Sequence, residues 1–170
     1  HPKVDIAVDP VDGTVSVAKG FNNAIAIIAM APEGKLLHAP DMYMQKIAVG
    51  PKVKGRVSLD MPIPDILVET AKALDKPIEE LTVTMLDRER HSNLMKICRQ
   101  MGCRIKLVMD GDVAAAIDTC FSHTGIDIML GSGGAPEGVL AAAAIKCLGG
   151  DFQGRLIAEE ESEYKRCQKM

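Results

Sequence analysis

Residues 62–150 alternate between helix-like and strand-like segments, and this alternation restricts the fold more than any other feature of the chain. The region opens at Pro62 and Pro64. Apolar periodicity predicts helices at residues 65–74, 92–101, 113–121 and 137–148, and strands at residues 81–86, 104–109 and 126–130. We expect Asp112 to cap the third helix and Pro136 to lie in the first turn of the fourth. Such alternation predicts a parallel sheet in a layered α/β fold.

The segments on either side of this region have a different character. Apolar runs at residues 4–8, 23–30 and 42–49 indicate strands, and a turn at 32–34 is expected to lead into a returning strand at 35–38. Links this short favour antiparallel pairing. A charged tail, residues 159–170, is predicted to be helical. We therefore divide the chain into a β-rich part, residues 1–61, and an alternating part, residues 62–170.

Composition excludes several classes of protein. The 170 residues are 47% apolar, which predicts a packed domain, and the net charge of −3 with 3% aromatic residues gives no reason to expect nucleic acid as a partner. No apolar stretch is long enough to cross a membrane. The five cysteines form no C-x-x-C pair, so neither a disulfide framework nor a zinc site is expected and a cytoplasmic location fits best.

Four polar clusters follow predicted strands at the carboxyl end of each strand. They are D-P-V-D-G-T at 9–14, D-R-E-R-H at 87–91, D-G-D at 110–112 and G-S-G-G at 131–134. Loops carry Asp and Gly for turns and caps in any case, which is the structural alternative. Ligands of open α/β sheets bind outside the carboxyl ends of strands, so we favour a functional site at this edge.

The first cluster carries two carboxylates, Asp9 and Asp12, and the hydroxyl of Thr14. Hard cations such as Mg²⁺ take oxygen ligands, and phosphoryl chemistry uses them to neutralise phosphate charge. A D-x-D-G-T motif would indicate the aspartyl nucleophile of haloacid dehalogenase-type phosphatases, but Pro10 stands where that nucleophile would be. A simple turn would explain Gly13 but not both acids. The motif predicts a metal-dependent phosphatase in which Thr14 positions a water.

Two further clusters offer contacts for phosphate. Residues 131–138 join a strand to a helix, where backbone N–H groups could cradle an anion, although no Lys-Ser/Thr follows as in a Walker loop. Arg88 and Arg90 could hold a phosphate bidentately, or simply lie on a solvated helix start. His38, His91 and His123 are not clustered, and we expect each of them to be structural.

Together these motifs resemble the class II fructose-1,6-bisphosphatases of bacteria, including the dual fructose/sedoheptulose bisphosphatases of cyanobacteria. The resemblance covers residues 4–154, with landmarks V-D-I-A-V-D-P at 4–10, A-P-D-M-Y-M at 39–44, D-G-D-V-A at 110–114 and G-G-A-P-E-G at 133–138. It implies a lithium-sensitive sugar-phosphatase fold, a layered α/β/α/β arrangement of antiparallel strands followed by a mostly parallel half. It also implies hydrolysis of the 1-phosphate of fructose 1,6-bisphosphate to fructose 6-phosphate, a step of gluconeogenesis, with Mg²⁺ or Mn²⁺.

The resemblance also implies roles for single residues. Asp9, Asp12 and Glu137 would be metal ligands, and Asp12 and Thr14 would be catalytic. The implied substrate-binding residues are Asp12, Gly13, Thr14, Tyr43, Arg88, Glu89, Arg90, Asp110, Gly111, Asp112 and Gly134. Two positions depart from the family pattern, since position 12 is often Glu and position 89 is often Pro.

Other functions stay open at this point. The same fold would serve a sedoheptulose-1,7-bisphosphatase, an inositol or nucleotide phosphatase, or an inactive sugar-phosphate-binding fragment or assembly module. Family members carry an upstream segment with two more acidic metal ligands and a further downstream segment, so we expect this chain to be truncated at both ends. A homo-oligomer is also expected.

Overall fold

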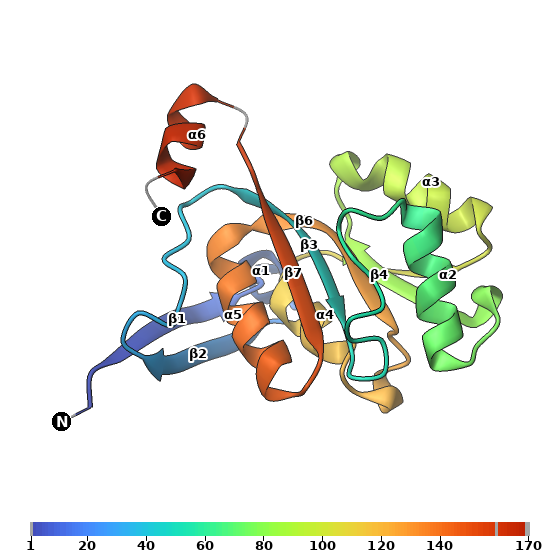
Figure 1. Ribbon diagram of the computed structural model, residues 1–170, viewed down its shortest axis with the longest axis horizontal. Helices are drawn as coiled ribbons and strands as arrows, with labels where there is room; N and C mark the ends of the chain where they lie inside the picture. Colours follow the sequence, from blue (N-terminus) through green and yellow to red (C-terminus); the bar gives the residue numbers. More distant parts are fainter. Residues whose placement is uncertain (1, 159, 169–170) are drawn as a thin grey trace.

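The computed structural model describes residues 2–158 and 160–168, which form two sheets and several helices (Figure 1). The strands are β1 (Val4–Asp12), β2 (Ile25–Pro32), β3 (Tyr43–Val49), β4 (Thr82–Leu86), β5 (Arg104–Val108), β6 (Ile128–Gly134) and β7 (Asp151–Ile157). The α-helices are α1 (Thr14–Lys19), α2 (Ile63–Leu74), α3 (Ser92–Gln100), α4 (Asp112–Asp118), α5 (Ala135–Cys147) and α6 (Glu161–Cys167). Three short 3₁₀ turns are η1 (Ile78–Glu80), η2 (Glu89–His91) and η3 (Ser122–Thr124).

The larger sheet has five strands in the order β5-β4-β6-β3-β7. β4 pairs in parallel with β5 and β6, as the alternation of helices and strands predicts. β3 runs antiparallel to both β6 and β7, so it places a strand from the β-rich part in the middle of the same sheet. Because these three strands are parallel, the carboxyl ends of β4, β5 and β6 lie at the same end of the sheet. The polar clusters are found at this end.

Two hydrophobic cores lie on opposite faces of this sheet. On one face, α2 and α3 cover a cluster that includes Ile47, Leu67 and Val83. On the other face, α4 and α5 cover a cluster that includes Ala48 and Val113, and the small sheet β1–β2 packs beyond these helices (Figure 1). The predicted layered α/β arrangement is therefore confirmed. No helix in residues 2–158 and 160–168 is long and apolar enough to span a membrane.

The small sheet is an antiparallel pair in which residues alternate between two faces. Ala7, Ile27 and Ala29 pack toward the core of α4 and α5. The opposite face exposes large apolar side chains in cross-strand pairs, Ile6 with Met30 and Val8 with Ile28. This apolar face has no partner in the part of the chain that the structure describes.

Several local predictions were wrong. Residues 35–38 form no strand, because β2 pairs with β1 and the backbone N–H groups of Lys35 and Leu36 donate to the Asp5 carboxylate instead. β1 continues to Asp12 rather than ending near Val8. Neither β7 nor α1 was predicted. The predicted tail helix is α6, with residues 159, 169 and 170 outside the described part.

Candidate functional site

The D-P-V-D-G-T motif lies where β1 passes into α1. The pairing with β2 is irregular between Asp9 and Asp12, so the strand carries a bulge there. Pro10 is tolerated because a bulge leaves backbone groups outside the ladder. Gly13 then turns the chain with φ of 92°, a left-handed conformation that favours glycine, and Thr14 begins α1 as an exposed residue. The motif is thus a strand end with a bulge, not a free loop.

Asp12 is buried against the start of α4. Its Oδ2 atom accepts a hydrogen bond from the backbone N–H of Val113 at 3.2 Å, across 101 positions of sequence. Gly111 stands at the N-cap of α4, where a side chain would meet Asp12 and the backbone of Gly13. The predicted cap was wrong, because Asp112 is the first helical residue and makes no capping bond. The D-P-V-D-G-T and D-G-D motifs are thereby joined.

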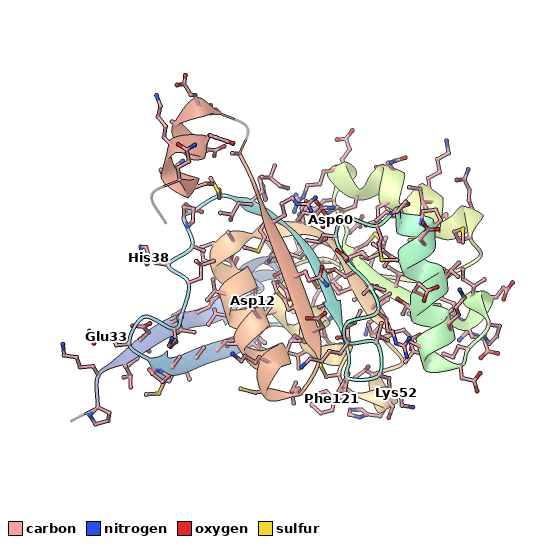
Figure 2. The ribbon with its side chains drawn as sticks, in the orientation of Figure 1. Asp12, Glu33, His38, Lys52, Asp60 and Phe121 are labelled. Carbon is pink, nitrogen blue, oxygen red and sulfur yellow. The ribbon has the colours of Figure 1, made fainter. Side chains whose placement is uncertain are left out.

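Burial, and after it the neighbouring carboxylates of Asp112, Asp9 and Glu137, together raise the pKa of Asp12 to about 6 against the opposing hydrogen bond from Val113. Three carboxylates therefore act on the buried Asp12. Figure 2 shows Asp12 toward the middle of the molecule, whereas Glu33 and His38 lie at its edge. A site that concentrates negative charge in this way is suited to a cation.

This shift predicts how stability depends on pH without divalent cations. The unfolded chain loses the Asp12 proton near pH 3.8 and the folded protein near pH 6, so the Asp12 contribution to stability falls as pH rises between these values. The difference corresponds to about 3 kcal/mol. Asp12→Asn keeps an acceptor for Val113 and removes the charge, so it should be more stable than the wild type at pH 7 and nearly equal at pH 4. Urea denaturation in chelator measures this, and an equal difference at both pH values would contradict it.

Glu137 lies in the first turn of α5, which begins directly after the N-cap Gly134. Its Oε2 atom is buried and makes no hydrogen bond. A Cβ at Gly134 would collide with this carboxylate, although the φ of −61° at Gly134 is open to any residue. Glycine is needed here for space. A buried, unpaired carboxylate oxygen is costly and calls for a ligand.

These observations bear on whether the site suits a metal ion. Asp9, Asp12 and Glu137 supply oxygen donors of the kind that Mg²⁺ and Mn²⁺ prefer, and the orphaned oxygen of Glu137 fits such a role. Among residues 2–158 and 160–168, however, no group of three or more His, Cys, Asp or Glu side chains is placed to hold a metal ion. The three carboxylates are therefore not arranged as a metal site by themselves, and their role as metal ligands stays a prediction.

Lys46 supplies the buried positive charge beside these acids. Its Nζ atom lies 2.6 Å from Oδ2 of Asp112, and the two residues are 1% and 8% exposed. Gly133 leaves room for this pair, since a Cβ there would meet the Asp112 carboxylate and crowd Nζ of Lys46. Sequence reasoning did not identify Lys46. The signal was its place on the inward face of β3, two residues from both Met44 and Ala48.

The D-G-D and D-R-E-R-H motifs are joined by an ion pair. Nη2 of Arg88 lies 3.4 Å from Oδ1 of Asp110, and Nη1 of Arg88 donates to the carbonyls of Asp87 and Met109. Oδ2 of Asp110 accepts from the backbone N–H of Val15 in α1. Asp110 thus ties the first turn of α1 to the loop after β4.

Arg90 and Tyr43 form a second contact at the same edge. The Arg90 guanidinium carbon lies 4.8 Å from the centre of the Tyr43 ring, which is half exposed and stands opposite Gly134 in the β3–β6 pairing. Glu89, which begins η2, is exposed. Residues 131–138 were predicted to link a strand that ends at Leu130 to a helix, but residues 131–134 belong to β6 because β3 pairs with them through Gly134.

The chain was then compared with known proteins. Residues 1–170 match the family described as bacterial fructose-1,6-bisphosphatase, glpX-encoded. The chain belongs to this family. A D-fructose 1,6-bisphosphatase class 2/sedoheptulose 1,7-bisphosphatase of Synechococcus sp. (strain JA-3-3Ab) is 50% identical over 159 residues, which are 94% of this chain and 46% of that protein.

Relatives from another bacterium agree. Fructose-1,6-bisphosphatase 1 class 2 of Escherichia coli (strain K12) is 46% identical over 180 residues, 98% of this chain and 54% of that protein. Fructose-1,6-bisphosphatase 2 class 2 of the same strain is 44% identical, over 99% of this chain and 57% of that protein. The resemblance predicted from the motifs is confirmed. The chain spans about half the length of the curated relatives it matches.

Proposed function

We propose that the protein to which this chain belongs hydrolyses the 1-phosphate of fructose 1,6-bisphosphate in a metal-dependent reaction. The observation that carries the proposal is that neighbouring carboxylates act on the buried Asp12, while Arg88 after β4 pairs with Asp110 of the D-G-D motif. Relatives that bear the names of fructose-1,6-bisphosphatases support it. The exposed hydroxyl of Thr14, at the start of α1, would orient the attacking water.

Each group of residues would have its own task. Asp9, Asp12 and Glu137 would hold Mg²⁺ or Mn²⁺ as part of a larger ligand set. When bound, such a cation neutralises phosphate charge and lowers the pKa of a bound water. Asp110 and Asp112 would bind sugar hydroxyls, with Gly13, Gly111 and Gly134 allowing close approach. Tyr43, Arg88 and Arg90 would bind the distal phosphate, and the negative charge of Glu89 would lie beside it.

A panel of phosphate esters tests the substrate. The full-length protein should release phosphate from fructose 1,6-bisphosphate in Mn²⁺ faster than from inositol or nucleotide monophosphates, because two arginines can bind a second phosphate. Sedoheptulose 1,7-bisphosphate belongs in the panel, since one relative is named for both activities. Binding of the sugar bisphosphate in a calorimeter without turnover would instead support an inactive binding module. A cytoplasmic location and a homo-oligomer stay predictions.

Asp9→Ala tests the metal-ligand role. In the described part of the chain, the hydrogen bond that the Asp9 side chain accepts is a local one from the backbone N–H of Val11 at 3.0 Å, so its loss should cost little stability. We expect phosphate release to fall by at least about tenfold and the Mn²⁺ concentration for half-maximal rate to rise. Asp65→Ala, at an exposed position in the first turn of α2, is the control. Unchanged turnover and Mn²⁺ dependence in Asp9→Ala would remove Asp9 from the ligand set.

A further inference from the structure

Ser132 is a residue of β6 that contacts the segment following β4. It belongs to the β3–β6 pairing, opposite Gln45, so its backbone is fixed by the sheet. Its N–H donates to Nε2 of His91 at 2.9 Å. Nδ1 of His91 lies 2.8 Å from the carbonyl oxygen of Leu86, which can only accept, so the ring proton is on Nδ1. The buried imidazole therefore bridges β4 to Ser132 as a neutral ring.

The side chain of His91 has little freedom to leave this position. It is 4% exposed and lies against Gly131, where a Cβ would crowd the ring. Burial lowers the pKa of His91, which favours the neutral form that accepts from Ser132. The expectation that His91 is structural is met, and its contacts show what it holds in place.

The other polar atoms of Ser132 bind Arg90. Nε of Arg90 donates to Oγ of Ser132 at 3.1 Å, and Nη2 donates to the Ser132 carbonyl at 2.8 Å. Together with the Tyr43 ring at 4.8 Å, these bonds fix the plane of the guanidinium. A guanidinium has five N–H groups in a rigid fork. Ser132 takes the edge formed by Nε and Nη2, and the Nη1–Nη2 edge stays available to an anion.

We infer that Ser132 is a positioning residue that holds Arg90 so that its Nη1–Nη2 edge receives the distal phosphate of a sugar bisphosphate. The identity of the anion rests on the proposed function, whereas the contact between Ser132 and Arg90 does not. A free arginine has many rotamers, and fixing it before binding removes part of the entropy cost of ordering it. The two-point contact of guanidinium with phosphate also depends on the orientation that Ser132 sets.

Ser132→Ala in the full-length protein tests this role through kinetics. The change removes Oγ, which lies 3.3 Å from Nε2 of His91 and accepts from Arg90, and it leaves the backbone bonds to both residues. We expect the KM for fructose 1,6-bisphosphate to rise by about tenfold, the size of one hydrogen bond to a charged group, with a smaller fall in kcat. Ser132→Thr keeps the hydroxyl and should restore the KM. Ser122→Ala, an exposed serine in η3, is the control.

A second measurement separates this inference from the proposed function. In the ligand-free protein, NMR can follow hydrogen exchange at Nε of Arg90, which Ser132→Ala should speed up at least several-fold and Ser132→Thr should not. An unchanged exchange rate, or equal loss of kcat and unchanged KM, would overturn the positioning role. If the wild type fails to hydrolyse the bisphosphate, the proposed function fails, while the exchange rate still decides whether Ser132 holds Arg90.

Discussion

Lys46→Met should lower the free energy of unfolding by about 3–5 kcal/mol, a range typical of breaking a buried ion pair from one side. Methionine fills much of the same volume, so the change mainly removes charge. Asp112 then stays buried, close to Asp12 and without its partner at 2.6 Å. Urea denaturation at pH 7 measures the loss.

Two variants make this prediction specific. Lys72→Met removes an exposed lysine that pairs with Glu69 one turn away, and it should cost less than about 1 kcal/mol. Lys46→Met combined with Asp112→Asn removes both charges and should recover a large part of the lost stability. Equal losses in the two single lysine variants, or no recovery in the double variant, would contradict a buried pair.

Glu137→Gln should separate stability from activity. The wild-type Oε2 atom is buried and unpaired, so replacing the carboxylate by an amide of the same shape should leave the metal-free protein as stable as before, or more so. If Glu137 is a metal ligand, the same change should lower metal-dependent phosphate release by at least about a hundredfold, the upper end of what even an outer-shell partner costs. Melting temperature with and without Mn²⁺, and initial rates, are the measurements.

The control for this experiment is Glu80→Gln, an exposed carboxylate in η1. It should change neither the rate nor the rise in melting temperature that Mn²⁺ produces. A Glu137→Gln protein that still gains stability from Mn²⁺ and keeps its rate would exclude Glu137 from the ligand set. A variant that is destabilised without metal would show that the carboxylate has a structural partner.

The two experiments examine one electrostatic arrangement. Negative charge is concentrated by four carboxylates, those of Asp9, Asp12, Asp112 and Glu137. The buried side chain of Lys46 compensates part of this charge through its ion pair with Asp112. Without Lys46, the metal-free protein contains a buried Asp112 carboxylate that has lost its partner. Without the Glu137 carboxylate, the metal-free protein loses a charge whose buried Oε2 atom makes no hydrogen bond. Opposite effects on stability are therefore expected from the same source.

Much of the fold could be predicted because its signals are local. Apolar periodicity predicted α2, α3 and β4 to within a few residues, because the helix and strand repeats depend on residues that are close in the sequence. The returning strand at 35–38 could not be excluded in this way. The residues around an apolar segment that follows a turn do not indicate whether a distant strand already pairs with the strand before the turn. Here β1 pairs with β2.

The sequence alone determined which residue types stand in the polar clusters, and with them the family. Only the tertiary structure decided that Asp12 meets the start of α4, that Lys46 pairs with Asp112, and that Ser132 binds Arg90. These contacts join residues separated by 101, 66 and 42 positions. They depend on how the layers pack and, for Lys46 and Asp112, on the space left by Gly133, which no local propensity encodes.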